Sequence, residues 1–519
     1  MKRTGLPAIL FAVLATLGGC GKPGPAPASA GRVLRISQRN EPADLDPARA
    51  SLPDEFFVIR ALGEGLLVPD PAGGAPLPAA AERFEVSADG LTYTFHLRDT
   101  KWSNGEPVTA EDFVESYRRE LSPATAAPKA SVFFAVKNAR NFVAGVLTEF
   151  SEVGFNAPDA RTLTVTLARP TPRFPFFVAS GPWIPVNPRV VKKYGRGWTR
   201  PDRYVGNGPF LLEEWRPQQR IIVQPNPAFR DAANVHLAGI QFLRFDDGDS
   251  EERAFRAGQI DVTMDVPRTK LEVYAAEHPA ELHRVPLAET RFLTFNTQRS
   301  ALADARVRRA LSLAIDRSKI VERVLLGGQE PTTRLVPPSL RPTDDSRADP
   351  LEPNPGEARR LLAAAGFAEG RQFPKLELSA WSRSQTAVLE AIQQMWKQEL
   401  GVEVALVVRD AKVHLTALMN GDYDIGFMTA IPDVADSADL LERFAPGAPE
   451  NYPHWTSADF SAALAARDLG TAERRLLDSA AIAPLYFNTQ HWLMSPRVHG
   501  WRQDAFWTRR YVGVTLDEK

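Results

Sequence analysis

Three carboxylates follow one another at and just beyond the end of the segment NGDYDIGFMTAIPDVADS, residues 420–437. A polar turn leads into an apolar run over 424–428, and the loop beyond it carries Asp433, Asp436 and Asp439. Such carboxylates are suited to general acid-base catalysis, to coordinating a metal ion, or to holding a cationic group of a ligand. Solvated loop residues or helix N-caps are the simpler alternative. The elements that carry the loop decide where it lies.

Alternating hydrophobic periods predict the order β-α-β-α-β over residues 376–380, 385–400, 402–408, 412–421 and 424–428. This order indicates a parallel sheet with right-handed crossovers. Ligands of such sheets bind beyond the carboxyl ends of the strands. Asp433 lies five residues past the last strand, and Trp381 and Arg383 lie just past the first. The sequence therefore predicts that these side chains are near the mouth of a binding site.

Further elements are predicted along the whole chain. Period-two alternation favours strands at 33–37, 91–97 and 161–167. Helical periodicity with capping residues favours helices at 109–121, 304–328 and 354–366. We expect Thr109, Asp304 and Asn354 to be their N-caps, and two glycines to end the helix over 304–328. Strands and helices thus alternate throughout, which indicates an α/β protein.

Length and charge exclude some classes of protein. The chain has 519 residues, enough for several domains with a large core. Its 62 lysines and arginines balance 63 aspartates and glutamates, so nothing favours a nucleic-acid partner. No G-x-S-x-G, P-loop, dinucleotide fingerprint or H-E-x-x-H motif is present. We therefore expect neither an enzyme nor a cofactor or metal site, and we expect a monomer.

The N-terminus has the pattern of an export signal. Lys2 and Arg3 precede an apolar stretch over 6–17, which is too short to span a bilayer. The sequence LGGC resembles the lipobox of bacterial lipoprotein precursors, which implies a signal peptide over 1–19 and lipidation of Cys20, the only cysteine. Residues 20–31 then form a flexible tether to a membrane of the cell envelope. An ordinary cleaved signal with an incidental cysteine is the alternative.

An ordered series of stretches resembles the bacterial solute-binding proteins of the oligopeptide and dipeptide ABC-importer family, known as family 5. The stretches include LDP, GNGPFLLEEW, FNT with DARVRRALSLAIDR, LLAAAGF, YDIGF and APLYF, at 45–47, 206–215, 295–317, 361–367, 423–427 and 483–487. Residues 64–123 also match. The resemblance runs from about residue 32 to the C-terminus.

This resemblance implies a periplasmic-binding-protein type II-like α/β fold, with two hinged lobes and a third domain. Lobe one is expected to comprise 32–63, 188–285 and 486–519, the extra domain 64–187, and lobe two 286–485. The solute is enclosed between the lobes as they close. The loaded receptor then docks on the permease subunits of an ABC transporter.

In peptide-binding members of this family, an Asp in a G-W-x-x-D arrangement holds the α-ammonium of the peptide, and Asp433 is the matching residue here. The aromatic position is Ala430, a basic residue of some members is Phe427, and Pro53 at the lobe-one edge has no N–H to donate. The resemblance and the sheet topology together give these candidate ligand-binding residues: Asp433, Ala430, Ile431, Trp381, Arg383, Phe427, Lys129 and Pro53.

We therefore expect a lipid-anchored receptor that captures short peptides for import and does no chemistry. The departures at Ala430 and Phe427 keep a second cargo open: a sugar, an opine-like conjugate or a metal chelate. Two rivals come from other classes, namely an envelope hydrolase that uses paired carboxylates and a chaperone-like envelope lipoprotein.

Overall fold

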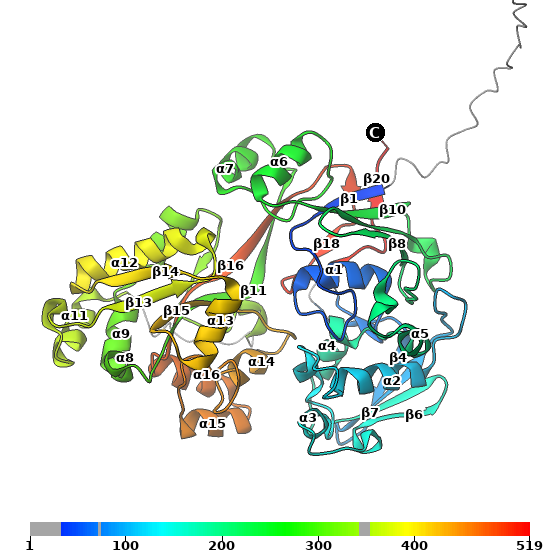
Figure 1. Ribbon diagram of the computed structural model, residues 1–519, viewed down its shortest axis with the longest axis horizontal. Helices are drawn as coiled ribbons and strands as arrows, with labels where there is room; N and C mark the ends of the chain where they lie inside the picture. The colour runs from blue at the N-terminus through cyan, green and yellow to red at the C-terminus, as the bar shows by residue number, and fades with distance from the viewer. Residues whose placement is uncertain (1–32, 71–73, 342–352, 519) are drawn as a thin grey trace, which may run out of the picture.

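The computed structural model describes residues 33–70, 74–341 and 353–518 of the chain. The expected signal peptide, Cys20 and the tether lie outside the described residues. Figure 1 shows two bodies side by side. One body contains the blue, cyan and green first half of the chain together with the C-terminal strands. The other contains the yellow and orange segments of the second half.

Lobe one is built on a four-stranded sheet in the order β1-β10-β9-β8. Its strands are β1 (Val33–Gln38), β10 (Gly239–Arg244), β9 (Arg220–Pro225) and β8 (Phe210–Arg216). β1 and β10 run parallel, and the other pairs are antiparallel. Helix α1 (Pro53–Leu62) covers this sheet with Phe57 and Ile59, which belong to the same hydrophobic core as Leu34 of β1. The short strand pairs β17–β20 and β18–β19 come from the C-terminal segment.

The extra domain has an antiparallel sheet in the order β4-β5-β7-β6. Its strands are β4 (Ala81–Val86), β5 (Thr92–Leu97), β7 (Thr162–Thr166) and β6 (Phe155–Asp159), and its helices are α2 (Ala110–Leu121), α3 (Ala139–Val143), α4 (Phe174–Val178) and α5 (Pro188–Tyr194). Thr109 and Asp112 form the capping box that begins α2, as the sequence predicts. The predicted strands at 33–37, 91–97 and 161–167 are confirmed.

Lobe two has a six-stranded sheet in the order β12-β16-β11-β15-β13-β14. The predicted β-α-β-α-β unit is confirmed as β13 (Leu376–Ala380), α12 (Thr386–Leu400), β14 (Val404–Val408), α13 (Ala411–Asn420) and β15 (Ile425–Ala430). β13 runs parallel to both β14 and β15, so the carboxyl ends of these strands share one edge. Further helices are α8 (Ser300–Ala303), α11 (Pro355–Ala364), α14 (Ser437–Glu442), α15 (Ala458–Ala465) and α16 (Leu469–Asp478).

Two long antiparallel strands connect the bodies, as Figure 1 shows. They are β11 (Leu282–Phe295) and β16 (Ile482–Leu493). On β11, Val285 packs against the core of lobe one, whereas Leu293 belongs to the core of lobe two. Helices α6 (Gly248–Arg256) and α7 (Arg268–Glu277) precede β11. The domain boundaries expected from the sequence stay predictions, but these strands are where a hinge between the bodies has to bend.

The single helix predicted over 304–328 is wrong. The segment forms α9 (Ala305–Leu313), α10 (Arg317–Ile320) and a π-helical turn (Val321–Leu325). Asp304 caps α9 as expected, but Asp316 starts a new helix by accepting the N–H of Lys319. Leu326 ends the segment with φ 56°, before the glycines are reached. Local capping by Asp316 therefore overrides the continuous hydrophobic period.

Candidate functional site

A cavity of about 500 Å³ lies between lobe two and the opposite body. Its walls come chiefly from residues 51–60 of lobe one, 129–132 and 173–182 of the extra domain, 428–435 and 443–452 of lobe two, and 504–508 near the C-terminus. The volume is in the usual range for small-molecule sites, roughly 300–1,000 Å³. Because three structural units meet here, closing or opening the lobes changes the cavity directly.

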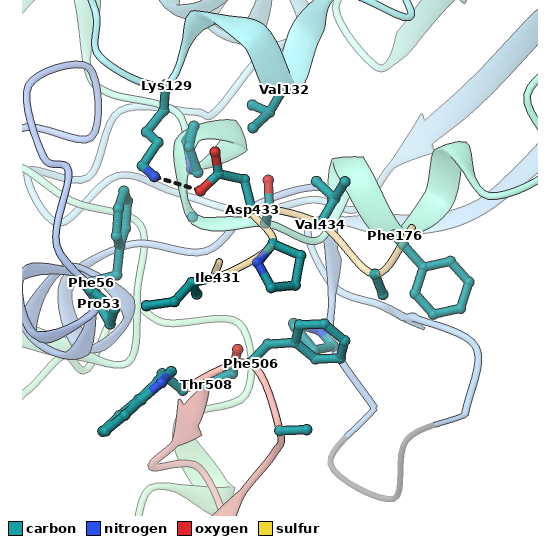
Figure 2. Close-up of a pocket in the computed structure, with 18 of the residues that line it drawn as sticks. Pro53, Phe56, Lys129, Val132, Phe176, Ile431, Asp433, Val434, Phe506 and Thr508 are labelled. Carbon is teal, nitrogen blue, oxygen red and sulfur yellow. Dashed lines mark hydrogen bonds and ion pairs between the residues drawn. The ribbon is translucent and has the colours of Figure 1, made fainter. Parts of the chain in front are cut away.

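Most of the lining is apolar. Figure 2 shows Phe56, Phe176 and Phe506 around the space, with Pro53 and Ile431 between them. Side chains of this kind exclude water and bind apolar parts of a solute without selecting a particular one. The charged groups that interrupt this apolar lining then fix the orientation of whatever binds.

The loop after β15 reaches across the interface. Val434 is only 3% exposed and belongs to the hydrophobic core of the extra domain, although it comes from lobe two. Next to it, Asp433 lines the cavity. Burial of Val434 on the far side thus fixes the position of the carboxylate between the two bodies.

Asp433 is paired with two cations. Its Oδ1 lies 2.5 Å from Nζ of Lys129, an extra-domain residue, and its Oδ2 lies 3.6 Å from Nη2 of Arg443 (Figure 2 shows the lysine contact). The Asp433 backbone N–H donates to Oδ2 of Asp439 at 2.8 Å. The side chains of Asp433 and Lys129 are 18% and 24% exposed, so both remain within reach of a bound solute.

Arg443 organises the carboxylates around this loop. It lies 3.0 Å from Asp439 and 3.0 Å from Glu450, and it donates to the carbonyl of Ile431 at 2.9 Å. Burial opposes its charge, yet the carboxylates of Asp439, Glu450 and Asp433 together raise its pKa. Burial also raises the pKa of Asp439 to about 6; Arg443 opposes this shift and the charge of Asp433 adds to it.

The ionised cluster carries one excess negative charge. Asp433, Asp439 and Glu450 supply three carboxylates, against the cations of Lys129 and Arg443. One further monovalent cation would balance the site, which suits the ammonium group of a ligand. Among the residues that the structure describes, no group of three or more His, Cys, Asp or Glu side chains is arranged to hold a metal ion.

Four of the candidate residues from the sequence come together at this cavity. Asp433, Ile431, Lys129 and Pro53 all line it, although they lie far apart in the chain. Lys129 precedes a short 3-10 turn (Ala130–Phe133) of the extra domain. Their roles in binding stay predictions.

The other four candidates do not line the cavity, which corrects their expected position. Ala430 and Phe427 are 3% and 1% exposed in β15, an interior strand between β11 and β13. Trp381 packs against His414 and Phe427, with ring centroids 5.8 and 5.7 Å apart. Arg383 begins a 3-10 turn (Arg383–Gln385) that leads into α12. Packing within lobe two accounts for the positions of Ala430, Phe427 and Trp381, whereas Arg383 is exposed to solvent outside the cavity.

Sequence reasoning missed several residues of the site. Arg443 was findable in principle, since it lies four residues after Asp439, the spacing that places side chains on one helical face. Phe56, Arg60, Arg173 and Phe506 also line the cavity but have no local signal, because only the tertiary fold brings them together.

The fold and the cavity define a class of protein: a two-lobed receptor with a third domain, which holds a small solute where its domains meet. Within residues 33–70, 74–341 and 353–518, none of the helices combines the length and apolar character needed to cross a membrane.

Comparison with known proteins gives the family. The sequence model of bacterial extracellular solute-binding proteins, family 5 (middle region), matches residues 75–452, and the chain belongs to this family. It is 31% identical over 502 residues to the probable deoxycholate-binding periplasmic protein YgiS of Escherichia coli, covering 92% of each chain. It is 32% identical over 486 residues to the periplasmic oligopeptide-binding protein OppA of Salmonella typhimurium, covering 89% and 88%.

A solved structure agrees with this assignment. The E. coli murein tripeptide binding protein MppA matches with a TM-score of 0.83 and 30% identity, over 94% of this chain and 99% of that one. The expected fold class, an α/β receptor of the periplasmic-binding-protein type, is confirmed. The protein is therefore a solute-binding component of bacterial import, in a family of extracellular binding proteins.

Proposed function

We propose that this protein captures short peptides in the cavity between its lobes and delivers them to the permease of an ABC importer. The observation that carries the proposal is the Asp433 cluster, which lines a mostly apolar cavity between the lobes and has one negative charge in excess. An α-ammonium group neutralises that charge. An unpaired buried charge on either partner would be costly, so the two groups need each other once the lobes are closed.

In this mechanism the peptide amine takes the place of Nζ of Lys129 on Oδ1 of Asp433, and Lys129 stays beside the cluster, so the charge of the ligand is the one that balances it. The peptide side chains rest against the apolar lining, which includes Phe56 and Phe506. Such surfaces bind by area rather than by shape-specific hydrogen bonds, so many side chains are accepted. The main chain of an extended peptide gives hydrogen bonds that are independent of sequence.

The protein acts as a monomer and does no chemistry of its own. Binding, lobe closure and delivery constitute the function. Lipidation of Cys20 holds the receptor at a membrane of the cell envelope.

A thermal-shift screen tests the proposal. The protein without residues 1–31 is mixed with libraries of peptides of two to eight residues and with sugars, opine-like conjugates and metal chelates. A ligand at 100 times its Kd stabilises the native state by about 2.7 kcal/mol, which gives a measurable rise in Tm. Peptide hits, recovered unchanged after long incubation, support the proposal. A clear rise in Tm with one of the other compounds, and none with any peptide, overturns it.

A second candidate function is the capture of an amphipathic organic acid. It is favoured by the ion pair of Lys129 with Asp433, which already satisfies the carboxylate that a peptide amine would need. The apolar lining also suits a rigid hydrocarbon body. The relative named as a probable deoxycholate-binding protein has a similar overall sequence, which makes deoxycholate the natural probe for this candidate.

A further inference from the structure

Four cationic side chains line the cavity, and they fall into two groups. Lys129 and Arg443 are neutralised by the carboxylates of the Asp433 cluster. Arg60 and Arg173 form no ion pair with any carboxylate of the described residues. Both unpaired arginines belong to the wall opposite lobe two, Arg60 in lobe one and Arg173 in the extra domain.

Arg60 lies in the last turn of α1. Its Nη1 is 3.4 Å from the carbonyl oxygen of Ala179. This marginal hydrogen bond is the only one that the guanidinium makes within the described residues. Burial lowers the pKa of Arg60, and the charge of Asp504 acts in the opposite direction. Asp504 is itself occupied, since it accepts the backbone N–H groups of Phe506 and Thr508 at 2.8 Å each.

Arg173 immediately precedes α4, whose far end leads to Ala179. Its guanidinium carbon lies 4.8 Å from the ring centre of Phe176, and its Nε is buried without a hydrogen-bond partner within the described chain. The cation–π contact holds the guanidinium in place but accepts none of its hydrogens. Arg173 and Ala179, whose carbonyl contacts Arg60, stand at the two ends of α4, and all three residues line the cavity.

Both guanidinium groups are partly buried and neither has a carboxylate of the described residues within ion-pair distance, so an anionic ligand group would compensate for part of their lost hydration. The planar array of N–H donors of a guanidinium matches a carboxylate better than any neutral acceptor. We propose that Arg60 and Arg173 bind a carboxylate group of the solute. This inference rests on the proposed solute-binding function and adds a requirement to it: the ligand carries an acid, placed on the wall opposite Asp433.

The carboxylate has two possible sources, the C-terminus of a peptide or the acid group of an amphipathic molecule such as a bile acid. Asp70 and Asp504 also line the cavity, so the wall is not strongly cationic as a whole. The selectivity comes from the two guanidinium groups that lack an ion pair, rather than from a general positive potential.

Calorimetric titration with matched acids and amides tests this inference. The probes are tri-, tetra- and penta-alanine with a free or an amidated C-terminus, and deoxycholate with its carboxamide. The variants are Arg60→Gln, Arg173→Gln and the double variant. Arg161→Gln is the control, since Arg161 is a half-exposed arginine of the extra domain paired with Asp99. We expect the acid to bind at least about tenfold more tightly than the amide in the wild type and the control. That preference falls below about threefold in the double variant.

The outcomes separate this inference from the proposed function. Preference for peptide acids, lost in the arginine variants, supports both. Binding of deoxycholate alone, again dependent on the arginines, supports the carboxylate site and overturns peptide capture. Equal binding of peptide acids and amides overturns the carboxylate site and leaves peptide capture standing. Failure of every probe to bind overturns the carboxylate site. Arg60→Gln removes a positive charge that acts on Asp504, so a modest fall of its ligand-free Tm is expected, and a cooperative melting transition shows that each variant is folded.

Discussion

Lys129 and Asp433 form an ion pair of 2.5 Å that joins the extra domain to lobe two across the cavity. The ammonium of the lysine occupies the position that a ligand amine is proposed to take. The free energy of binding such a ligand is therefore a difference between two ammonium groups competing for one carboxylate, and not the full strength of a charge-assisted hydrogen bond.

Removal of the Lys129 ammonium should strengthen the binding of a ligand amine rather than weaken it. Lys129→Met should tighten binding of free-amine peptides by up to about fivefold, because partly exposed ion pairs of this kind are worth about 0.2–1 kcal/mol and no longer have to be broken. N-acetylated peptides should gain nothing. Calorimetric titration measures both, with Lys137→Met, an exposed lysine of the same domain, as the control. Weaker binding of free-amine peptides would mean that Lys129 contacts the ligand rather than competing with it.

Asp433→Asn tests the other side of the pair. The amide cannot neutralise an ammonium group, so free-amine peptides should bind about 3- to 30-fold more weakly, which is less than the full value of a hydrogen bond to a charged group because the competing Lys129 pair is lost as well. N-acetylated peptides should change less than about threefold. Asp459→Asn, an exposed residue of the same lobe, serves as the control. Equal losses for both peptide types would assign Asp433 a structural role only.

Acidification should weaken binding of free-amine peptides. Burial raises the pKa of Asp439 to about 6, so the cluster of Asp433, Asp439 and Glu450 loses its excess negative charge as the pH falls through 6. Linkage requires a ligand cation to favour the ionised form, and its affinity then drops by up to about tenfold per pH unit below that pKa. Titrations at pH 5, 6, 7 and 8 measure the effect, with an N-acetylated peptide as the reference. If the affinities of the two peptides change with pH in the same way, the charge of Asp439 does not act on the ligand amine.

Much of the architecture is predictable from local pattern. The β-α-β-α-β unit that ends at β15 follows from alternating periods, and it places the Asp433 loop at the carboxyl edge of the strands. The same reasoning fails where one residue changes the local balance, as at Asp316, whose cap divides the helix expected over 304–328. A hydrophobic period indicates which residues are buried, but it does not show whether they belong to one continuous helix.

The candidate site is harder to predict, because its residues meet only in the folded chain. Topology places Trp381 and Asp433 after strands of one sheet, yet Trp381 turns into the core of lobe two against His414. Ala430 and Phe427 are expected at functional positions from the resemblance to the family, but they lie in an interior strand. Arg60 and Arg173 come from other domains, and no spacing along the sequence indicates that they share a cavity.

Membrane attachment is tested by Cys20→Ser. Without the thiol no lipid is attached, and the two or three acyl chains that make anchoring stable are absent. The variant should appear in the soluble envelope fraction while the wild type sediments with membranes, as judged by immunoblotting after fractionation. Lys22→Ser, two residues away, is the control. Membrane retention of the Cys20 variant would contradict lipid anchoring, while peptide binding by the soluble part should be the same in either case.

Arg443 should be essential to the stability of lobe two. Its guanidinium, 19% exposed, contacts Asp439, Glu450 and the carbonyl of Ile431. Arg443→Gln leaves these carboxylates partly buried and unpaired, a loss that is typically about 3–5 kcal/mol for a buried ion pair. Scanning calorimetry should show a lower Tm for the variant, whereas Arg475→Gln, a half-exposed arginine of the same lobe, should melt like the wild type.

Two companion variants separate charge from geometry at this position. Arg443→Lys keeps the charge but a single ammonium cannot reach every acceptor of the planar guanidinium, so it should restore only part of the lost stability. Adding Asp439→Asn to Arg443→Gln removes one unpaired carboxylate, and the double variant should be more stable than Arg443→Gln alone. If the double variant instead loses the sum of the two single effects, Asp439 and Arg443 are not coupled, and the Asp433 loop is held in place by the burial of Val434 alone.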